Sequence, residues 1–141
     1  MPFVLDASVA IAVFLEDEAS AYADAVASAM TAGELAHTPA IWPLEVLNNL
    51  LVAERRKRVT SDETGQLLEF LATLPIEVSA AELVDAGASE LRLARQLNLT
   101  AYDAAYIALA QRRAIPLATV DARLKKAAVV AGVQIFKPKR T

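Results

Sequence analysis

The sequence predicts an α/β fold of three layers, with a central parallel sheet of about four to five strands and helices on both faces. Short apolar runs alternate with Ala- and Leu-rich segments of helical pattern along all 141 residues. Repeated strand–helix–strand units of this kind form parallel sheets. Hydrophobic residues make up 55% of the chain and charged residues 22%, which is sufficient for a packed core. The length predicts a single domain spanning residues 1–141.

Strands are predicted where a short apolar run lies between segments of helical pattern or turn signals. Five such runs follow one another along the chain: residues 3–5, 35–38, 75–78, 115–120 and 133–136. The first run ends at Asp6 and the fourth at Asp121. Because helical segments separate the runs, we expect the strands to be parallel.

Helices are predicted in the segments between these runs from their apolar spacing. In chain order they are residues 8–15, 19–32, 39–56, 60–74, 80–97, 100–113 and 122–131. The prolines of the third helix lie only near its start, where they are tolerated. Gly33 and Gly132 follow two predicted helix ends, as C-cap glycines do. Two pairs have the spacing of capping boxes, Thr60 with Glu63 and Thr100 with Asp103. We expect the tail, residues 137–141, to be frayed.

Several classes of protein are excluded or disfavoured by composition. The chain has no cysteine, which excludes disulfides and thiolate chemistry and fits the cytoplasm, where we expect the protein. No apolar run reaches the roughly 18 residues of a membrane span, and the N-terminus has no basic segment of a signal peptide. His37 is the only histidine, so a zinc site or a Ser-His-Asp triad would depend on it alone, and we interpret it as structural.

The formal net charge is −3, whereas nucleic-acid-binding proteins are more often basic. Either nucleic acid is not the ligand, or the acidic residues gather in a metal site and the basic residues lie elsewhere. The basic clusters are Arg55 to Arg58, Arg112 with Arg113, Lys125 with Lys126, and Lys137, Lys139 and Arg140. They could bind phosphates. They could equally be solvated helix ends, which is the slightly favoured interpretation for Arg55 to Arg58.

Four carboxylates lie at or near predicted strand-to-helix junctions. Asp6 and Asp121 end strands, Glu45 lies early in the helix 39–56, and Asp103 lies in the first turn of a helix. If the junctions share one edge of the sheet, the four acids could converge there. Carboxylate and water ligands suit Mg²⁺ or Mn²⁺, which would remove the mutual repulsion. Alternatively, each acid caps a helix or complements its dipole, and periodicity alone leaves both interpretations open.

Other polar and aromatic residues near these junctions have two interpretations each. Ser8 and Thr119 could bind a metal-coordinated water or cap a helix. Trp42, Tyr102 and Tyr106 could stack on bases. Since the two tyrosines are four residues apart on one helix face, core packing is the favoured interpretation for them.

Four segments together resemble the motifs of the PIN-domain family. They are Val4-Leu5-Asp6-Ala7-Ser8, Pro43-Leu44-Glu45-Val46-Leu47-Asn48, residues 99–110 around Asp103, and residues 118–124 around Asp121. The motifs follow the family's order, and the size and spacing are similar to those of the VapC-type toxins. The third is the most specific single match.

The resemblance implies a function that spacing alone does not. It implies a parallel sheet with Asp6, Glu45, Asp103 and Asp121 at one edge, binding Mg²⁺ or, as a substitute, Mn²⁺, directly or through water. It implies hydrolysis of RNA by a metal-activated water. Ser8, Asn48 and Thr119 are implied more weakly as supporting polar groups. It also implies a homodimer and a cognate antitoxin that blocks the active site.

Two other functions stay open. A phospho-accepting domain also uses an Asp at a strand end with Mg²⁺, but it usually has a second acid beside that Asp or two positions later. Asp6 is flanked instead by Leu5, Ala7 and Ser8, which disfavours this function. A pure interaction module would use the acids only as caps and its apolar surface for a partner, and it predicts no response to metal.

Overall fold

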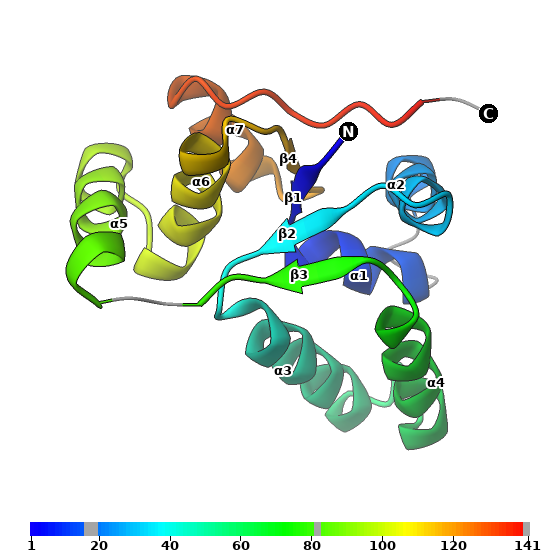
Figure 1. Ribbon diagram of the computed structural model, residues 1–141. Coiled ribbons are helices and arrows are strands. Elements are labelled where there is room, and N and C mark those ends of the chain that lie inside the picture. The colour runs from blue at the N-terminus through cyan, green and yellow to red at the C-terminus, as the bar shows by residue number, and fades with distance from the viewer. Residues whose placement is uncertain (16–19, 81–82, 140–141) are drawn as a thin grey trace.

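The structure, a computed structural model, describes residues 1–15, 20–80 and 83–139. Its elements follow one another in the order β1 (Phe3–Leu5), α1 (Ala7–Phe14), α2 (Ala21–Thr31), β2 (Ala36–Thr38), α3 (Trp42–Arg55), α4 (Ser61–Ala72), β3 (Ile76–Val78), α5 (Leu83–Leu97), α6 (Ala101–Arg113), β4 (Leu117–Ala118) and α7 (Ala122–Val130) (Figure 1). Strands and helices alternate as the sequence predicted.

The sheet has four strands in the order β3-β2-β1-β4, and every pairing is parallel. On β1, Val4 pairs with His37 on one side and with Leu117 on the other. All three residues of β1 are fully buried, as expected for a central strand covered on both faces. The predicted parallel α/β sheet is therefore confirmed.

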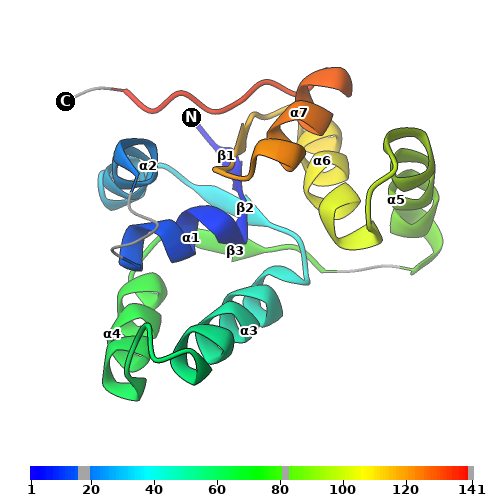
Figure 2. The same cartoon turned by 180° about the vertical axis from the view of Figure 1, so that it is seen from behind.

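Helices cover both faces of the sheet. The helix α6 packs against β1 and β4, and α5 packs on the outside of α6. The helix α1 packs against α2 and α3. It lies behind the sheet in Figure 1 and in front of it in the reverse view of Figure 2, so it occupies the face opposite α6. Helix α1 is apolar almost all round because it is enclosed, with Val9, Ala10, Ile11 and Ala12 all buried.

The fourth and fifth predicted strands are shorter than expected. Of the run at 115–120, only Leu117–Ala118 form the strand β4. Pro116, just before it, has no amide hydrogen to donate, although its carbonyl accepts a hydrogen bond from the Val4 amide at 2.8 Å. The segment 133–136 forms a single parallel bridge, between Ile135 and Leu117, in place of a strand. The ring of Phe136 nevertheless stacks on Phe3 with ring centroids 4.1 Å apart, so this segment closes the core beside β1.

The helix predicted from residue 39 begins at Trp42, with Pro43 in its first turn, where a missing amide hydrogen costs little. The capping box of Thr60 and Glu63 is present in both directions, at 3.1 and 3.0 Å. The predicted helix start at Ala19 and the end of the tail at 140–141 lie outside the described residues. Ala80, where the helix 80–97 was predicted to start, is not helical, and this helix is described from Leu83. Within the described ranges, none of the helices combines the length and apolar character that a membrane crossing requires.

Candidate active site

One cavity of about 380 Å³ collects residues from four separate parts of the chain. Its lining comprises Asp6, Ala7, Ser8, Ile11, Leu15, Glu45, Asn49, Val52, Arg56, Arg58, Asp103 and Asp121. The loop after β1, the loop after β4 and the first turns of α3 and α6 each contribute one carboxylate. The structure thus brings the four acidic residues singled out from the sequence to one cavity.

Asp6 is the most buried of these carboxylates, with 7% of its surface exposed. It occupies the N-cap position of α1, yet its side chain makes no capping hydrogen bond. Its Oδ2 atom instead accepts hydrogen bonds from Ser8 Oγ at 2.6 Å and from Thr119 Oγ1 at 2.8 Å. Burial raises the pKa of Asp6, the two hydroxyls oppose the rise, and the nearby Asp121 and Asp103 add to it.

Asp121 caps a helix, which is one of the two interpretations that the sequence left open for it. Its Oδ1 atom accepts hydrogen bonds from the amides of Arg123 at 2.9 Å and Leu124 at 3.1 Å, in the first turn of α7. No described residue donates a hydrogen bond to its second oxygen. Because capping uses one oxygen, the capping and cavity interpretations are compatible for Asp121.

Glu45 is held by a residue that the sequence interpretation had assigned to core packing alone. Tyr106 Oη donates a hydrogen bond of 2.5 Å to Glu45 Oε1. The tyrosine is indeed fully buried, but its hydroxyl reaches from α6 to α3. Burial raises the pKa of Glu45, and Asp6 and Asp103 raise it further. Burial also raises the pKa of Tyr106 far above its usual range, so its hydroxyl remains a donor.

Asp103 is partly exposed in the first turn of α6. Its amide donates to Thr100 Oγ1 at 3.1 Å, which is half of the predicted capping box. Among the described residues, the reciprocal bond from the Thr100 amide to its carboxylate is not formed. Burial raises the pKa of Asp103, the neighbouring Asp121 raises it further, and Arg123 lowers it.

The donor set of this cavity fits a hard divalent cation. Its acidic ligands offer oxygen only, and oxygen ligands suit Mg²⁺ and Mn²⁺. For Asp6, Glu45 and Asp121, one carboxylate oxygen is held by the protein, and no described residue donates to the other. Within the described ranges, no three Asp, Glu or His side chains are placed so that they could hold a metal ion together. An ion in this cavity would therefore be held directly by one or two of the carboxylates and by the others through water, which is usual for Mg²⁺.

The remaining polar residues singled out from the sequence are distributed differently. Asn48 is exposed and does not line the cavity, whereas Asn49, four residues after Glu45 on the same helix face, does. His37 is buried within β2 and lies outside the cavity lining. Of the basic cluster at Arg55 to Arg58, only Arg56 and Arg58 line the cavity.

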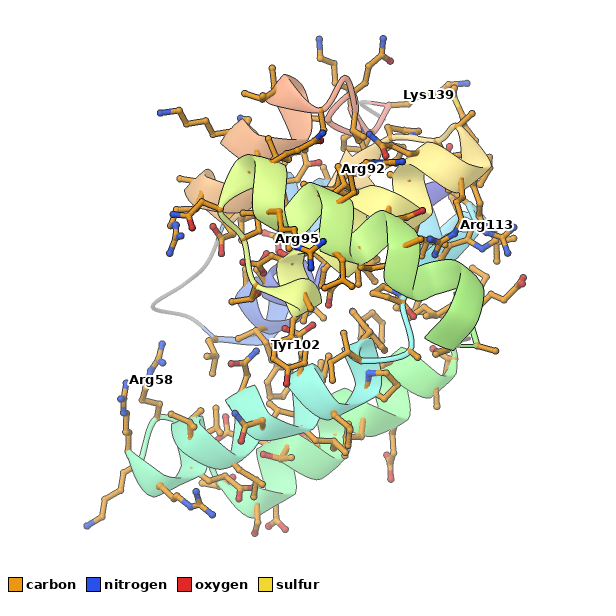
Figure 3. The ribbon with its side chains drawn as sticks, turned by 90° about the vertical axis from the view of Figure 1, so that its left-hand side faces the viewer. Arg58, Arg92, Arg95, Tyr102, Arg113 and Lys139 are labelled. Atoms are coloured by element: carbon orange, nitrogen blue, oxygen red, sulfur yellow. The ribbon has the colours of Figure 1, made fainter. Side chains whose placement is uncertain are left out.

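The aromatic residues divide into two groups. Trp42 and Tyr106 are buried in the core, with 6% and 0% of their surface exposed. Tyr102 has 59% of its surface exposed, so the prediction that both tyrosines pack in the core is wrong for Tyr102. Burial on α6 begins only at Ala104, and Tyr102 lies before the packed part of the helix. Figure 3 shows Tyr102 on the side of α6 that faces α3.

Comparison with known proteins gives concordant matches over nearly the whole chain. The PIN domain pattern matches residues 3–130. The chain is 37% identical to Ribonuclease VapC3 of Pyrobaculum aerophilum over 128 residues, covering 88% of this chain and 92% of that protein. It is 33% identical to Ribonuclease VapC12 of Mycobacterium tuberculosis over 121 residues, covering 86% and 88%. The crystal structure of PAE2754 from Pyrobaculum aerophilum shares the fold, with a TM-score of 0.67 at 20% identity, covering 94% and 90%.

Proposed function

The chain belongs to the PIN-domain family, and from that premise we propose that it is a divalent-metal-dependent endoribonuclease and the toxin of a toxin–antitoxin pair. The relatives named ribonucleases, at 37% and 33% identity, support RNA as the substrate. The single observation that carries the proposal is the gathering of four carboxylates from four parts of the chain in one cavity. Isolated capping residues have no reason to gather in this way.

In this proposal Asp6, Glu45, Asp103 and Asp121 hold Mg²⁺, with Mn²⁺ as a substitute, directly or through water. When bound, the ion lowers the pKa of water and offsets negative charge on a phosphoryl group, as hydrolysis of a phosphodiester requires. Burial and then mutual repulsion raise the pKa of Asp6, Glu45 and Asp103, and the repulsion favours uptake of a cation.

The chain's own contribution is to fix the orientation of the carboxylates before substrate arrives. Ser8 and Thr119 hold Asp6 through Oδ2, and Tyr106 holds Glu45 through Oε1. Such supporting hydrogen bonds lower the reorganisation needed when a ligand binds. Since Asn49 and not Asn48 lines the cavity, we assign the supporting amide role to Asn49.

The proposed partners are RNA, a cognate antitoxin that blocks the cavity, and a second copy of the chain in a homodimer. Light scattering on the purified protein measures the last of these directly, and a monomer at all concentrations would remove it from the proposal. The PIN domain match over residues 3–130 supports treating residues 1–141 as one nuclease domain.

The test of the proposed function is cleavage of a mixed RNA pool by the purified protein with Mg²⁺, with Mn²⁺ and with EDTA, beside the variant Asp6→Asn. We expect cleavage only with metal and only by the parent protein. Asp6→Asn that cuts like the parent would overturn the role of Asp6. Absence of both cleavage and any rise in melting temperature with Mn²⁺ would favour an interaction module instead.

A further inference from the structure

One face of α3 lines the cavity from the start of the helix to its end. Glu45, Asn49, Val52 and Arg56 all belong to the lining, and their spacing of four, three and four residues is that of a single helix face. The helix axis rises roughly 16 Å between Glu45 and Arg56. The cavity is therefore elongated along α3, with Glu45 near one end and Arg56 near the other.

The two ends of this stripe carry opposite charge. At the first end Glu45 joins Asp6, Asp103 and Asp121, and at the second end Arg56 is joined by Arg58. Figure 3 shows Arg58 at the C-terminal end of α3. With every group ionised, four carboxylates and two guanidinium groups leave the lining with a formal charge of −2. One divalent cation at the acidic end would bring that charge to zero.

We propose that Arg56 and Arg58 bind a backbone phosphate of the RNA, a few nucleotides from the cleaved bond, so that a single strand follows the Glu45–Asn49–Val52–Arg56 stripe of α3. The proposal rests on the proposed ribonuclease function and adds a substrate-binding subsite to it. A guanidinium group is suited to this role because its planar donors match two phosphate oxygens at once. The apolar Val52 separates the two charged ends and offers an apolar surface to a base or a sugar.

The favourable interaction of cations with the end of a helix dipole does not explain why Arg56 and Arg58 line the cavity and their neighbours do not. It applies to all of the basic cluster at the end of α3, including Arg55 and Lys57. Only Arg56 and Arg58 line the cavity, and both side chains are exposed to solvent. Arg55 and Lys57 therefore provide a matched control, with the same charge in the same segment but outside the cavity.

The test measures the binding of a fluorescent single-stranded RNA pool in an Asp6→Asn background, which prevents cleavage. Two double variants are compared across a range of salt concentrations. Arg56→Gln with Arg58→Gln is the cavity pair, and Arg55→Gln with Lys57→Gln is the control pair. We expect the cavity pair to bind RNA about 10- to 100-fold more weakly, as for the loss of hydrogen bonds to charged groups. The slope of log affinity against log salt should fall by about 0.7 for each phosphate that the variant no longer neutralises. The control pair should lose less than about threefold in affinity.

A measurement of metal binding distinguishes the role of the two arginines from that of the carboxylates. Removing two cations from the lining should leave the rise in melting temperature with Mn²⁺ unchanged or larger, measured with Asp6 intact. Arg58 has a further interaction in the fold, so the single variant Arg56→Gln repeats the comparison if the double variant melts early.

Equal weakening by the two pairs, no weakening by either pair, or no RNA binding by the parent would each overturn the inference. Failure of the proposed function is a separate result, namely RNA bound through the cavity pair but never cleaved with any metal.

Discussion

Tyr106 and Glu45, 61 positions apart in the sequence, meet through a hydrogen bond of 2.5 Å that joins α6 to α3. The tyrosine is fully buried and its hydroxyl remains protonated, because burial raises its pKa. This bond therefore fixes one oxygen of Glu45 at a constant position beside the cavity. It also links α3, which carries Glu45, to α6, which carries Asp103.

The variant Tyr106→Phe tests this bond. It keeps the ring in the core and removes only the hydroxyl, so we expect the fold to persist with a loss of about 1 kcal/mol in the free energy of unfolding. Cleavage and Mn²⁺ affinity should fall about 10- to 100-fold, as for other residues that orient metal ligands. Single-turnover cleavage and metal-dependent melts measure both.

Tyr22→Phe is the matched control for that experiment. Tyr22 Oη donates a hydrogen bond of 2.6 Å to the backbone oxygen of Phe136, and Tyr22 does not line the candidate active site. Its loss should cost similar stability and leave Mn²⁺ affinity unchanged. Equal effects of both variants on Mn²⁺ affinity would refute the positioning role of Tyr106.

Thr119→Val replaces the hydroxyl that donates to Asp6 Oδ2 and accepts from the Asp121 amide at 3.0 Å. Shape is nearly retained, so we expect a loss of about 1–3 kcal/mol from the buried polar groups left without a partner. Cleavage should fall about tenfold, because Asp6 loses one of its two supporting hydroxyls. Thr31→Val, which removes a hydroxyl bonded to Ala27 O on α2, should lower stability alone. Parent-like cleavage by Thr119→Val would contradict the supporting role.

The stability of the metal-free protein should depend on pH in a defined direction. The folded-state pKa values of Asp6, Glu45 and Asp103 lie above their ordinary values of 3.8, 4.5 and 3.8. The folded state therefore holds protons more tightly than the unfolded chain. The contribution of these groups is complete below their ordinary pKa values and is lost as the pH rises through the folded-state pKa values.

Thermal melts in EDTA, from a pH below these ordinary pKa values upwards, measure this loss of stability for the parent and for Asp6→Asn. The parent should lose more stability than the variant as the pH rises. His37 acts in the opposite sense, since burial lowers its pKa below 6.5, and its contribution cancels in the difference between the two proteins. Added Mn²⁺ should raise the parent's melting temperature more at the higher pH, because protons compete with the metal. If the melting temperatures of the parent and the variant change with pH in parallel, the result would argue against mutual repulsion of the carboxylates at the cavity.

The capping box of α4 offers a stability test separate from the site. Thr60→Ala removes the hydroxyl that accepts from the Glu63 amide at 3.1 Å. The expected loss is about 1 kcal/mol in the free energy of unfolding, measured by denaturant titration. Cleavage under folding conditions should stay at the parent's rate. A large loss of cleavage without unfolding would mean that α4 takes part in the site.

Local signals in the sequence were sufficient for the order of the strands and helices. The gathering of the four acids followed only from the resemblance to the PIN-domain family, because periodicity left the capping interpretation equally open. Apolar runs show where β1 and β4 lie, and Asp6 and Asp121 follow the last strand residues, Leu5 and Ala118. The link between Tyr106 and Glu45 depends on how α3 and α6 are placed relative to each other, and no local pattern encodes that placement.

The sequence also did not predict which of two adjacent residues on a helix faces the cavity. Asn48 and Asn49 lie three and four residues after Glu45, so both spacings place an asparagine near its face of α3, but only Asn49 lines the cavity. The exposure of Tyr102 could not be predicted for a similar reason, since it depends on where α6 begins to pack against the sheet.

The stacking of Phe136 on Phe3 brings the C-terminal segment of the described chain beside the first strand. The polypeptide therefore closes on itself in space, which is the arrangement that tolerates circular permutation. A short linker could join these two segments, and new ends could open in an exposed turn elsewhere in the chain. The four carboxylates would meet at the same cavity in such a permuted chain, because their positions depend on the sheet order and not on which segment is synthesised first.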